Sequence, residues 1–127
     1  GRAYGGGYYE YPEDGPKYIW PKLYELYHNP EIDYPHQDIK DRILFRQVLE
    51  SVKCLDEGVF NAVRDGNIGS IMGIGFPPHT GGVFQFINTY GFKAFVERAE
   101  ELQARYGERF AVPQSLQDRA KSEEQYQ

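Results

Sequence analysis

The sequence has little of what stabilises small secreted proteins or holds a chain in a membrane. Its 127 residues include a single cysteine, Cys54, so no disulfide can form within the chain, and a reducing compartment such as the cytoplasm fits this composition. We interpret Cys54 as a small buried apolar side chain rather than a reactive thiol. No apolar run approaches the ~18 residues of a membrane span. The formal net charge of −5 argues against nucleic acid and against an anionic membrane as the main partner.

Motifs that carry enzyme chemistry are also missing. Residues 66–69 and 73–75 are rich in glycine, but neither segment follows a predicted strand with the spacing of a dinucleotide-binding turn. The histidines, His28, His36 and His79, include no i, i+4 pair, so we expect no metal site. No nucleophile elbow and no phosphate-binding loop of the Walker type occurs. We therefore expect no catalytic, cofactor-binding or metal-binding residue in this chain.

Large aromatic rings are abundant instead. Aromatic residues make up 16% of the chain, with eleven tyrosines and eight phenylalanines, so we expect one core built on rings. We assign residues 1–37 to a glycine- and tyrosine-rich extended segment followed by a short helix that opens at Pro21. A disordered linker is the alternative for residues 1–18. We favour an extended segment held on the domain surface, because its closely spaced rings are poorly accommodated in water.

Hydrophobic periodicity predicts that residues 38–127 form an all-α bundle of four to five helices. The predicted N-caps are Asp38, Asp65 and Thr80. The first long helix is apolar on two sides, which is typical of a helix packed between neighbours. We expect carboxylates to lie mostly on solvated helix faces and residues 121–127 to form a frayed tail. The predicted helices cover residues 39–57, about 65–73, 83–90, 92–106 and 113–120.

A stiff corner separates the second and third predicted helices. Residues 73–82 contain four glycines and two adjacent prolines, which cannot continue a helix or strand. The residue before each proline is restricted to extended backbone, so the corner should be rigid. Gly81 and Gly82 permit another backbone to approach closely, or leave N–H groups available to an anion such as a phosphate of CoA. We favour close packing.

This corner and its surroundings resemble the C-terminal domain of 3-hydroxyacyl-CoA dehydrogenases. The likeness is greatest to the last repeat of that domain in the multifunctional α-subunits of fatty-acid β-oxidation. Two positions depart from the family pattern, because Gly6 and Asn67 stand where the family has charged residues. The matching segments are residues 5–11, 54–58, 65–69, 73–82, 83–91 and 110–113.

The resemblance implies an all-helical domain of the kind shared with 6-phosphogluconate dehydrogenase. It also implies a cytoplasmic parent enzyme that oxidises (3S)-3-hydroxyacyl-CoA to 3-oxoacyl-CoA with NAD. Within that parent, this domain packs against the nucleotide-binding domain and another C-terminal repeat, or a second copy in a homodimer, and shapes part of the acyl-CoA cleft. The isolated piece is expected to be inactive. The predicted structural and interface residues are Gly73, Gly75, Phe76, Pro77, Pro78, Gly81, Gly82, Phe86 and Tyr90.

Alternatives remain at this point. His28, followed by Asn29 and Pro30, superficially resembles the family's catalytic histidine segment, but the intervening aromatics are missing and we assign it to a helix end. Because the sequence starts at Gly1 without methionine, we expect an excised piece of a longer protein. The alternative is a stand-alone helical interaction module with the same fold. An independent enzyme that uses His79 and nearby carboxylates has little support.

Overall fold

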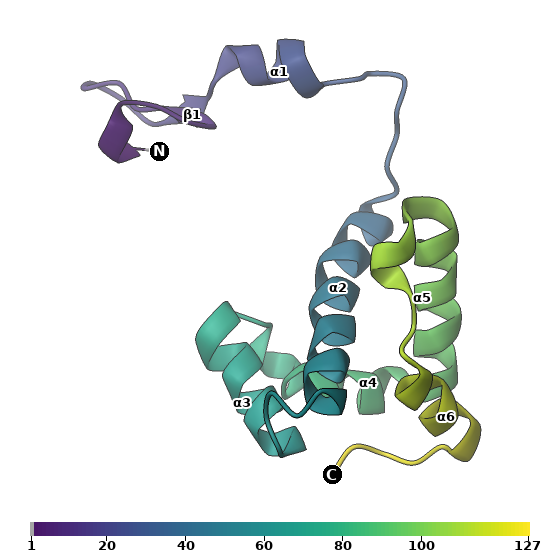
Figure 1. Cartoon of the computed structure of the whole chain (residues 1–127). Helices are drawn as coiled ribbons and strands as arrows, with labels where there is room; N and C mark the ends of the chain where they lie inside the picture. The colour runs from purple at the N-terminus through teal and green to yellow at the C-terminus, as the bar shows by residue number, and fades with distance from the viewer. Residues whose placement is uncertain (1) are drawn as a thin grey trace. The chain divides into compact units, whose positions relative to one another are not determined.

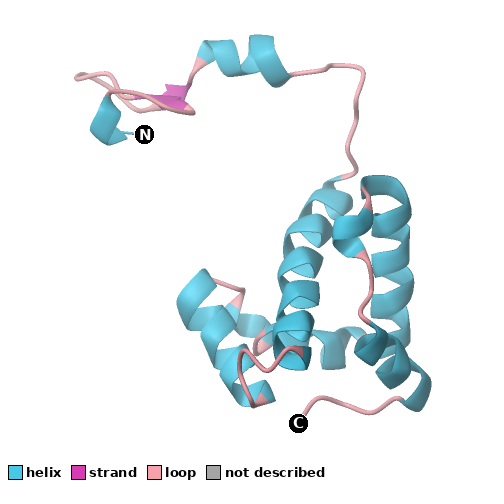
Figure 2. Ribbon diagram, in the orientation of Figure 1, coloured by secondary structure: helices cyan, strands magenta, loops and turns pink. Residues whose placement is uncertain are grey.

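The computed structural model describes residues 2–127, which fall into two units. The N-terminal unit ends at Tyr34, and the helical unit comprises Pro35–Gln127. Helices dominate the secondary structure of the described chain (Figure 2), so the predicted all-α class is confirmed. The predicted domain boundary, between residues 37 and 38, falls inside the first turn of a helix that begins at His36.

The N-terminal unit contains a small hairpin that the sequence reading did not anticipate. Strand β1 (Tyr9–Glu10) pairs antiparallel with β2 (Tyr18–Ile19), after a 3₁₀ turn η1 (Arg2–Tyr4). Helix α1 (Pro21–Tyr27) follows and begins with proline as predicted. His28 caps its end, with its N–H bonded to the Tyr24 carbonyl, which confirms the helix-end assignment. Strands this short have little stability of their own. That the segment is held on the helical unit stays a prediction.

The helical unit is a bundle organised around one long helix. In Figure 1, α2 lies between α3 and α5, with α4 crossing near its C-terminal end, and α2 contacts all three helices. Helix α6 packs on α5, and a 3₁₀ turn, η3, joins those two helices. The helices are α2 (His36–Asp56), α3 (Val63–Ile74), α4 (Val83–Tyr90), α5 (Phe92–Tyr106) and α6 (Gln114–Ser122), with 3₁₀ turns η2 (Pro78–Thr80) and η3 (Glu108–Phe110).

The core is built on aromatic rings, as expected. Phe45 of α2 stacks on Phe95 of α5 with ring centroids 4.2 Å apart, and it meets the Tyr90 ring edge-on at 5.4 Å. The apolar face of α2 that the sequence identified is buried in this core. Its other apolar side is not, because Ile39 and Ile43 are 43% and 58% exposed. The expectation that both apolar sides are covered is therefore wrong within the helical unit, although α2 does lie between neighbouring helices. Fully buried side chains are Phe45, Val48, Leu49, Val52, Val83, Phe84, Ile87, Phe95, Ala99, Leu102 and Leu116.

The predicted N-caps are wrong in each case. Helix α2 starts after Pro35, and Asp38 lies within its first turn, buried against α5. Helix α3 starts after Ala62, which leaves Asp65 in its first turn. Helix α4 starts after Gly82, so Thr80 belongs to the corner instead. Cys54, expected to be buried, is only partly so.

The C-terminal segment is part of the core, which corrects the expectation of a frayed tail. Tyr126 is 5% exposed, and its ring packs on Phe84 at 4.7 Å and on Phe92 at 5.7 Å between centroids. The Asn88 side-chain amide binds the backbone of Tyr126 twice. It donates to the Tyr126 carbonyl at 2.8 Å and accepts from the Tyr126 N–H at 3.1 Å. The Arg119 guanidinium lies 4.5 Å from the ring centroid. Burial raises the pKa of Tyr126 to about 12.

Candidate functional site

The glycine–proline corner joins α3 to α4 through a defined series of backbone contacts. Helix α3 ends at Gly75, whose φ of 71° is left-handed, and the Phe76 N–H returns to the Ser70 carbonyl at 2.9 Å. Thr80 then ties the proline turn together, because its hydroxyl donates to the Pro77 carbonyl at 2.7 Å. The chain enters α4 through Gly81 and Gly82, both at positive φ. The corner predicted between two helices is present.

Gly82 marks the point where α3 and α4 come closest. A Cβ at this position would lie 2.5 Å from the Asn67 Cα and 2.7 Å from the Asn67 carbonyl oxygen. On the opposite side of the contact, a Cβ on Gly66 would collide with the Phe84 ring. Gly82 therefore lets the two backbones touch, and Gly66 lets the α3 backbone touch the Phe84 ring. This is the close approach favoured from the sequence.

The N-terminus of α4 is capped by side chains of α3. Asn67 Oδ1 accepts hydrogen bonds from the Phe84 N–H at 2.9 Å and the Gln85 N–H at 3.2 Å. Ser70 Oγ accepts from the Val83 N–H at 3.3 Å, and Thr80 Oγ1 accepts from the Gly82 N–H at 3.2 Å. The backbone N–H groups that could have bound a phosphate at this helix start thus already donate to acceptors within the domain. This geometry favours packing over an anion site at Gly81 and Gly82.

Removing the Asn67 cap should destabilise the domain. We expect Asn67→Ala to lower the free energy of unfolding by about 1–2 kcal/mol, because two helix N–H groups lose their acceptor. Asn67→Asp keeps the acceptor and places a negative charge at the positive end of α4, so it should add about 0.3–1 kcal/mol. Urea unfolding at pH 7 measures both. Asn61→Ala, in an exposed loop, is the control and should change stability by less than about 0.5 kcal/mol. An aspartate variant less stable than the alanine variant would refute the capping role.

A cavity of ≈ 350 Å³ opens beside the corner. Phe86 and Tyr90 give it an apolar wall, and Thr80, Thr89 and His79 add polar groups. Burial is the main cause that raises the pKa of Tyr90. No carboxylate is among the described residues that line the cavity. The cavity is suited to holding an apolar group rather than to acid–base catalysis.

The structure distributes the predicted interface residues between the core and the surface. Phe76 is 1% exposed, so it belongs to the core and offers no contact surface. Gly82 is likewise buried against α3. Phe86 is partly buried, and Tyr90 is 39% exposed at the rim of the cavity. The remaining predicted residues on the exposed side of the corner are Gly73, Gly75, Pro78 and Gly81, with Pro77 partly buried.

The outer face of α3 was missed by the sequence reading. Ile68 and Met72, four residues apart on one face of α3, are 55% and 81% exposed, which leaves an apolar face next to the corner. Clustered exposed apolar side chains of this kind are typical of surfaces that contact another protein segment. The helical pattern of these residues was visible in the sequence, but nothing in it distinguished a buried face from an uncovered one.

A cluster of buried charges joins α2 to α5. Asp38 and Asp41 are 3% and 4% exposed, two exceptions to the expectation that carboxylates lie mostly on solvated faces. Arg98 bridges them, with 2.6 Å from Nη2 to Asp38 Oδ1 and 2.8 Å from Nε to Asp41 Oδ2. Asp38 Oδ2 also accepts from the Tyr106 hydroxyl at 2.5 Å and pairs with Arg105 at 2.7 Å.

These contacts make the cluster structural rather than catalytic. The Tyr106 hydrogen bond, followed by the Arg98 hydrogen bond, lowers the pKa of Asp38 below its ordinary 3.8. The same hydrogen bond raises the pKa of Tyr106. Gln37 occupies the remaining oxygen of Asp41 at 2.7 Å. Each carboxylate oxygen already has a partner, so no proton acceptor is left for a substrate.

Residues 2–127 contain no group of three or more histidine, cysteine, aspartate or glutamate side chains placed to hold a metal ion. Within the same part of the chain, each helix is too short or too polar to cross a lipid bilayer.

The chain is similar to a segment of fatty acid oxidation complex α-subunits. No protein-family profile matches the chain. The fatty acid oxidation complex subunit alpha of Vibrio cholerae serotype O1 is 40% identical over 121 residues, and that of Vibrio parahaemolyticus is 39% identical over 121 residues. The subunit of the same name from Shewanella sp. (strain MR-7) is 36% identical over 126 residues. Each alignment covers 94% of this chain but only 17% or 18% of the relative. The chain therefore spans less than a fifth of the length of these relatives.

Proposed function

Since the chain is homologous to one segment of fatty acid oxidation complex α-subunits, we propose that it forms the last helical repeat of the dehydrogenase region of such a subunit. In this proposal the parent oxidises (3S)-3-hydroxyacyl-CoA to 3-oxoacyl-CoA with NAD in the cytoplasm. The NAD site and the catalytic histidine belong to other segments of the parent. The chain contributes a packing surface and part of the acyl-CoA cleft, and it is inactive alone. The alignment over 94% of the chain and the all-α fold support this assignment.

The exposed apolar face of α3 is the observation that carries the packing role. Met72 is 81% exposed, and Ile68 lies one helical turn away, so covering both with another helical repeat removes apolar surface from water and lowers the free energy. The partner in the proposal is another C-terminal repeat or the nucleotide-binding domain of the parent, or a second copy of this chain. The cavity lined by Phe86 and Tyr90 supports a contact with an apolar acyl group nearby.

Self-association tests the packing surface. We expect the molar mass of the chain, measured by light scattering after size exclusion, to rise with concentration because the α3 faces of two copies pair. Met72→Glu should return the chain to a monomer. Gln125→Glu adds the same charge at an exposed position away from α3 and should leave association unchanged. An unsubstituted chain that stays strictly monomeric at high concentration would exclude a second copy of this chain as the partner of this surface.

Nucleotide binding tests the division of labour within the parent. We expect no saturable binding when the chain is titrated with NADH, followed by nicotinamide fluorescence, and no NADH formation from NAD and a 3-hydroxyacyl-CoA. Micromolar NADH binding would overturn the placement of the cofactor site on other polypeptide. The gene sequence upstream of Gly1 distinguishes the parent enzyme from a stand-alone module. A G-x-G-x-x-G unit encoded there in the same frame supports the parent enzyme. A stop codon with a ribosome-binding site there supports the module.

A further inference from the structure

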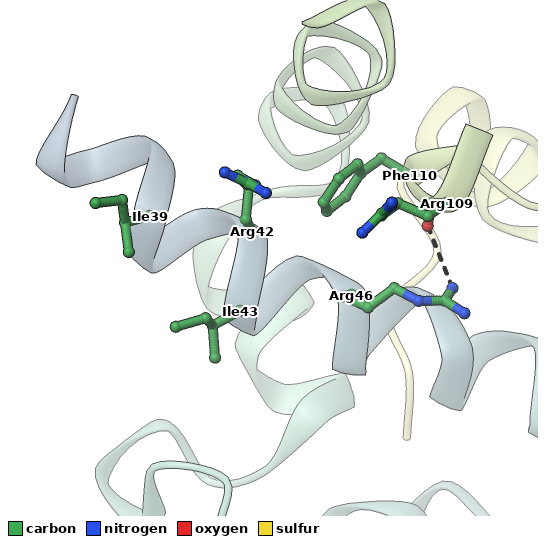
Figure 3. Close-up of a pocket in the computed structure, with 6 residues that line it drawn as sticks. All are labelled: Ile39, Arg42, Ile43, Arg46, Arg109 and Phe110. Atoms are coloured by element: carbon green, nitrogen blue, oxygen red, sulfur yellow. Dashed lines mark hydrogen bonds between the residues drawn. The ribbon is translucent and has the colours of Figure 1, made fainter. Parts of the chain in front are cut away.

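A second hollow lies between α2 and η3, away from the corner. Its volume is ≈ 310 Å³, and Figure 3 shows Arg109 reaching from η3 toward α2 beside the Phe110 ring. The residues from α2 recur at intervals of three and four, so they share one helix face. Phe110 is 1% exposed and closes the inner wall. The lining residues are Ile39, Arg42, Ile43, Arg46, Arg109 and Phe110.

This hollow is basic although the chain as a whole is acidic. Its six lining residues include three arginines and no carboxylate, against a formal net charge of −5 for the chain. Glu50 offsets one charge by pairing with Arg46 at 2.8 Å. Glu108, the nearest acidic residue in sequence to Arg109, has a carboxylate oxygen bonded to Gln103 at 3.1 Å. Like charges gathered in a concave site concentrate the field that attracts an anion.

Two of the arginines are held in place by contacts with the domain. The Arg42 guanidinium lies 4.4 Å from the centroid of the Tyr106 ring. Arg46 donates to the Arg109 carbonyl at 3.2 Å, a bond drawn in Figure 3. The Arg109 guanidinium makes no hydrogen bond or ion pair with any residue that the structure describes. The site therefore combines two arginines that are held in position, Arg42 and Arg46, with Arg109, whose N–H donors are available.

We propose that this hollow binds the diphosphate group of a small ligand. Guanidinium groups match phosphate oxygens in bidentate geometry, and more than one cation is needed to neutralise a diphosphate. Ile39 and Ile43, 43% and 58% exposed, give the hollow an apolar wall that fits an organic portion attached to the phosphates. Free diphosphate and a nucleoside diphosphate share this chemistry. The inference does not depend on the function proposed for the parent.

Titration with inorganic pyrophosphate tests the site. Amide shifts in a ¹H–¹⁵N spectrum of the full chain, recorded at low and constant ionic strength, should saturate with a dissociation constant below about 1 mM. The shifts should be confined to residues 39–46 and 108–110. Arg109→Gln should weaken binding by about tenfold, because a charge-assisted contact is lost. Arg64→Gln removes one charge from an 82% exposed side chain on α3 and should leave the affinity unchanged.

The second titration, with ADP, identifies the source of the diphosphate. Tighter binding of ADP than of pyrophosphate, with added shifts at Ile39 and Ile43, assigns the site to a nucleoside diphosphate, and equal affinities assign it to the free anion. Shifts scattered over all basic residues, or affinity unchanged by Arg109→Gln, would overturn the proposal. A hexaglutamate peptide that binds the same residues more tightly than either ligand would also overturn it, in favour of an acidic protein segment.

Discussion

Replacing Gly82 by alanine is expected to lower the free energy of unfolding by about 3–4 kcal/mol. Two causes add. The backbone at Gly82 has a φ of 106°, which side chains with a Cβ rarely adopt. The new Cβ would also lie 2.5 Å from the Asn67 Cα, and a backbone atom cannot move aside as a flexible side chain can. Urea unfolding followed by circular dichroism measures the loss.

Gly73 provides the matched control for this substitution. It lies within α3, and a Cβ added there meets nothing within 4 Å. Gly73→Ala should therefore raise stability by about 0.5–1 kcal/mol, because alanine favours the helix. If the free energy of unfolding of the Gly82→Ala chain lies within about 1 kcal/mol of that of the unsubstituted chain, α3 and α4 do not pack as closely as described.

Replacing Arg98 by methionine is expected to cost about 2–3 kcal/mol at pH 7, because Asp38 and Asp41 stay buried without their shared cation. We place the loss below that of a fully enclosed pair, since the Arg98 side chain is 17% exposed. Chemical unfolding gives the difference. Arg64→Met, at an 82% exposed ion pair with 3.8 Å between the charged atoms, should change stability by less than about 0.5 kcal/mol.

The cluster of Asp38, Asp41 and Arg98 should also make the free energy of unfolding depend on pH. The folded pKa of Asp38 lies below its ordinary 3.8, so its contribution to stability is present above that value and is lost as the pH falls through the folded pKa. In the Arg98→Met chain Asp38 loses one of the hydrogen bonds that lower its pKa, while the Tyr106 hydrogen bond and Arg105 remain, so less of its contribution is left to be lost on acidification. The difference in free energy of unfolding between the unsubstituted chain and the Arg98→Met chain should therefore shrink as the pH falls from 7 to 3. A difference that stays constant over this range would contradict the ion-pair account.

The elements bounded by local signals could be predicted from the sequence. Helices α4 and α5 end where expected because Gly91 and Gly107 follow them, and their apolar spacing fixes which faces are buried. The corner between α3 and α4 was recognisable because glycine and proline restrict the backbone locally. These signals act within a few residues, so they need no knowledge of the rest of the fold.

Contacts between distant segments were not predictable in the same way. Asp38 was read as a helix cap because aspartate has that preference, yet its partners Arg98 and Tyr106 lie 60 and 68 residues further along the chain. Asn67 caps α4 from 17 residues away, although the sequence showed it only as a departure from a family pattern. The choice among possible hydrogen-bond partners is made by tertiary packing, which no local preference encodes.

The position of Tyr126 governs the order in which this domain can be completed during synthesis. A nascent chain that has reached only Ser122, the end of α6, contains every helix but still leaves the rings of Phe84 and Phe92 without the side chain that covers them. The ribosome must therefore add the residues through Tyr126 before the hydrophobic interior closes. A shortened version designed to stop at the last helix would carry the same uncovered rings and would be prone to aggregate.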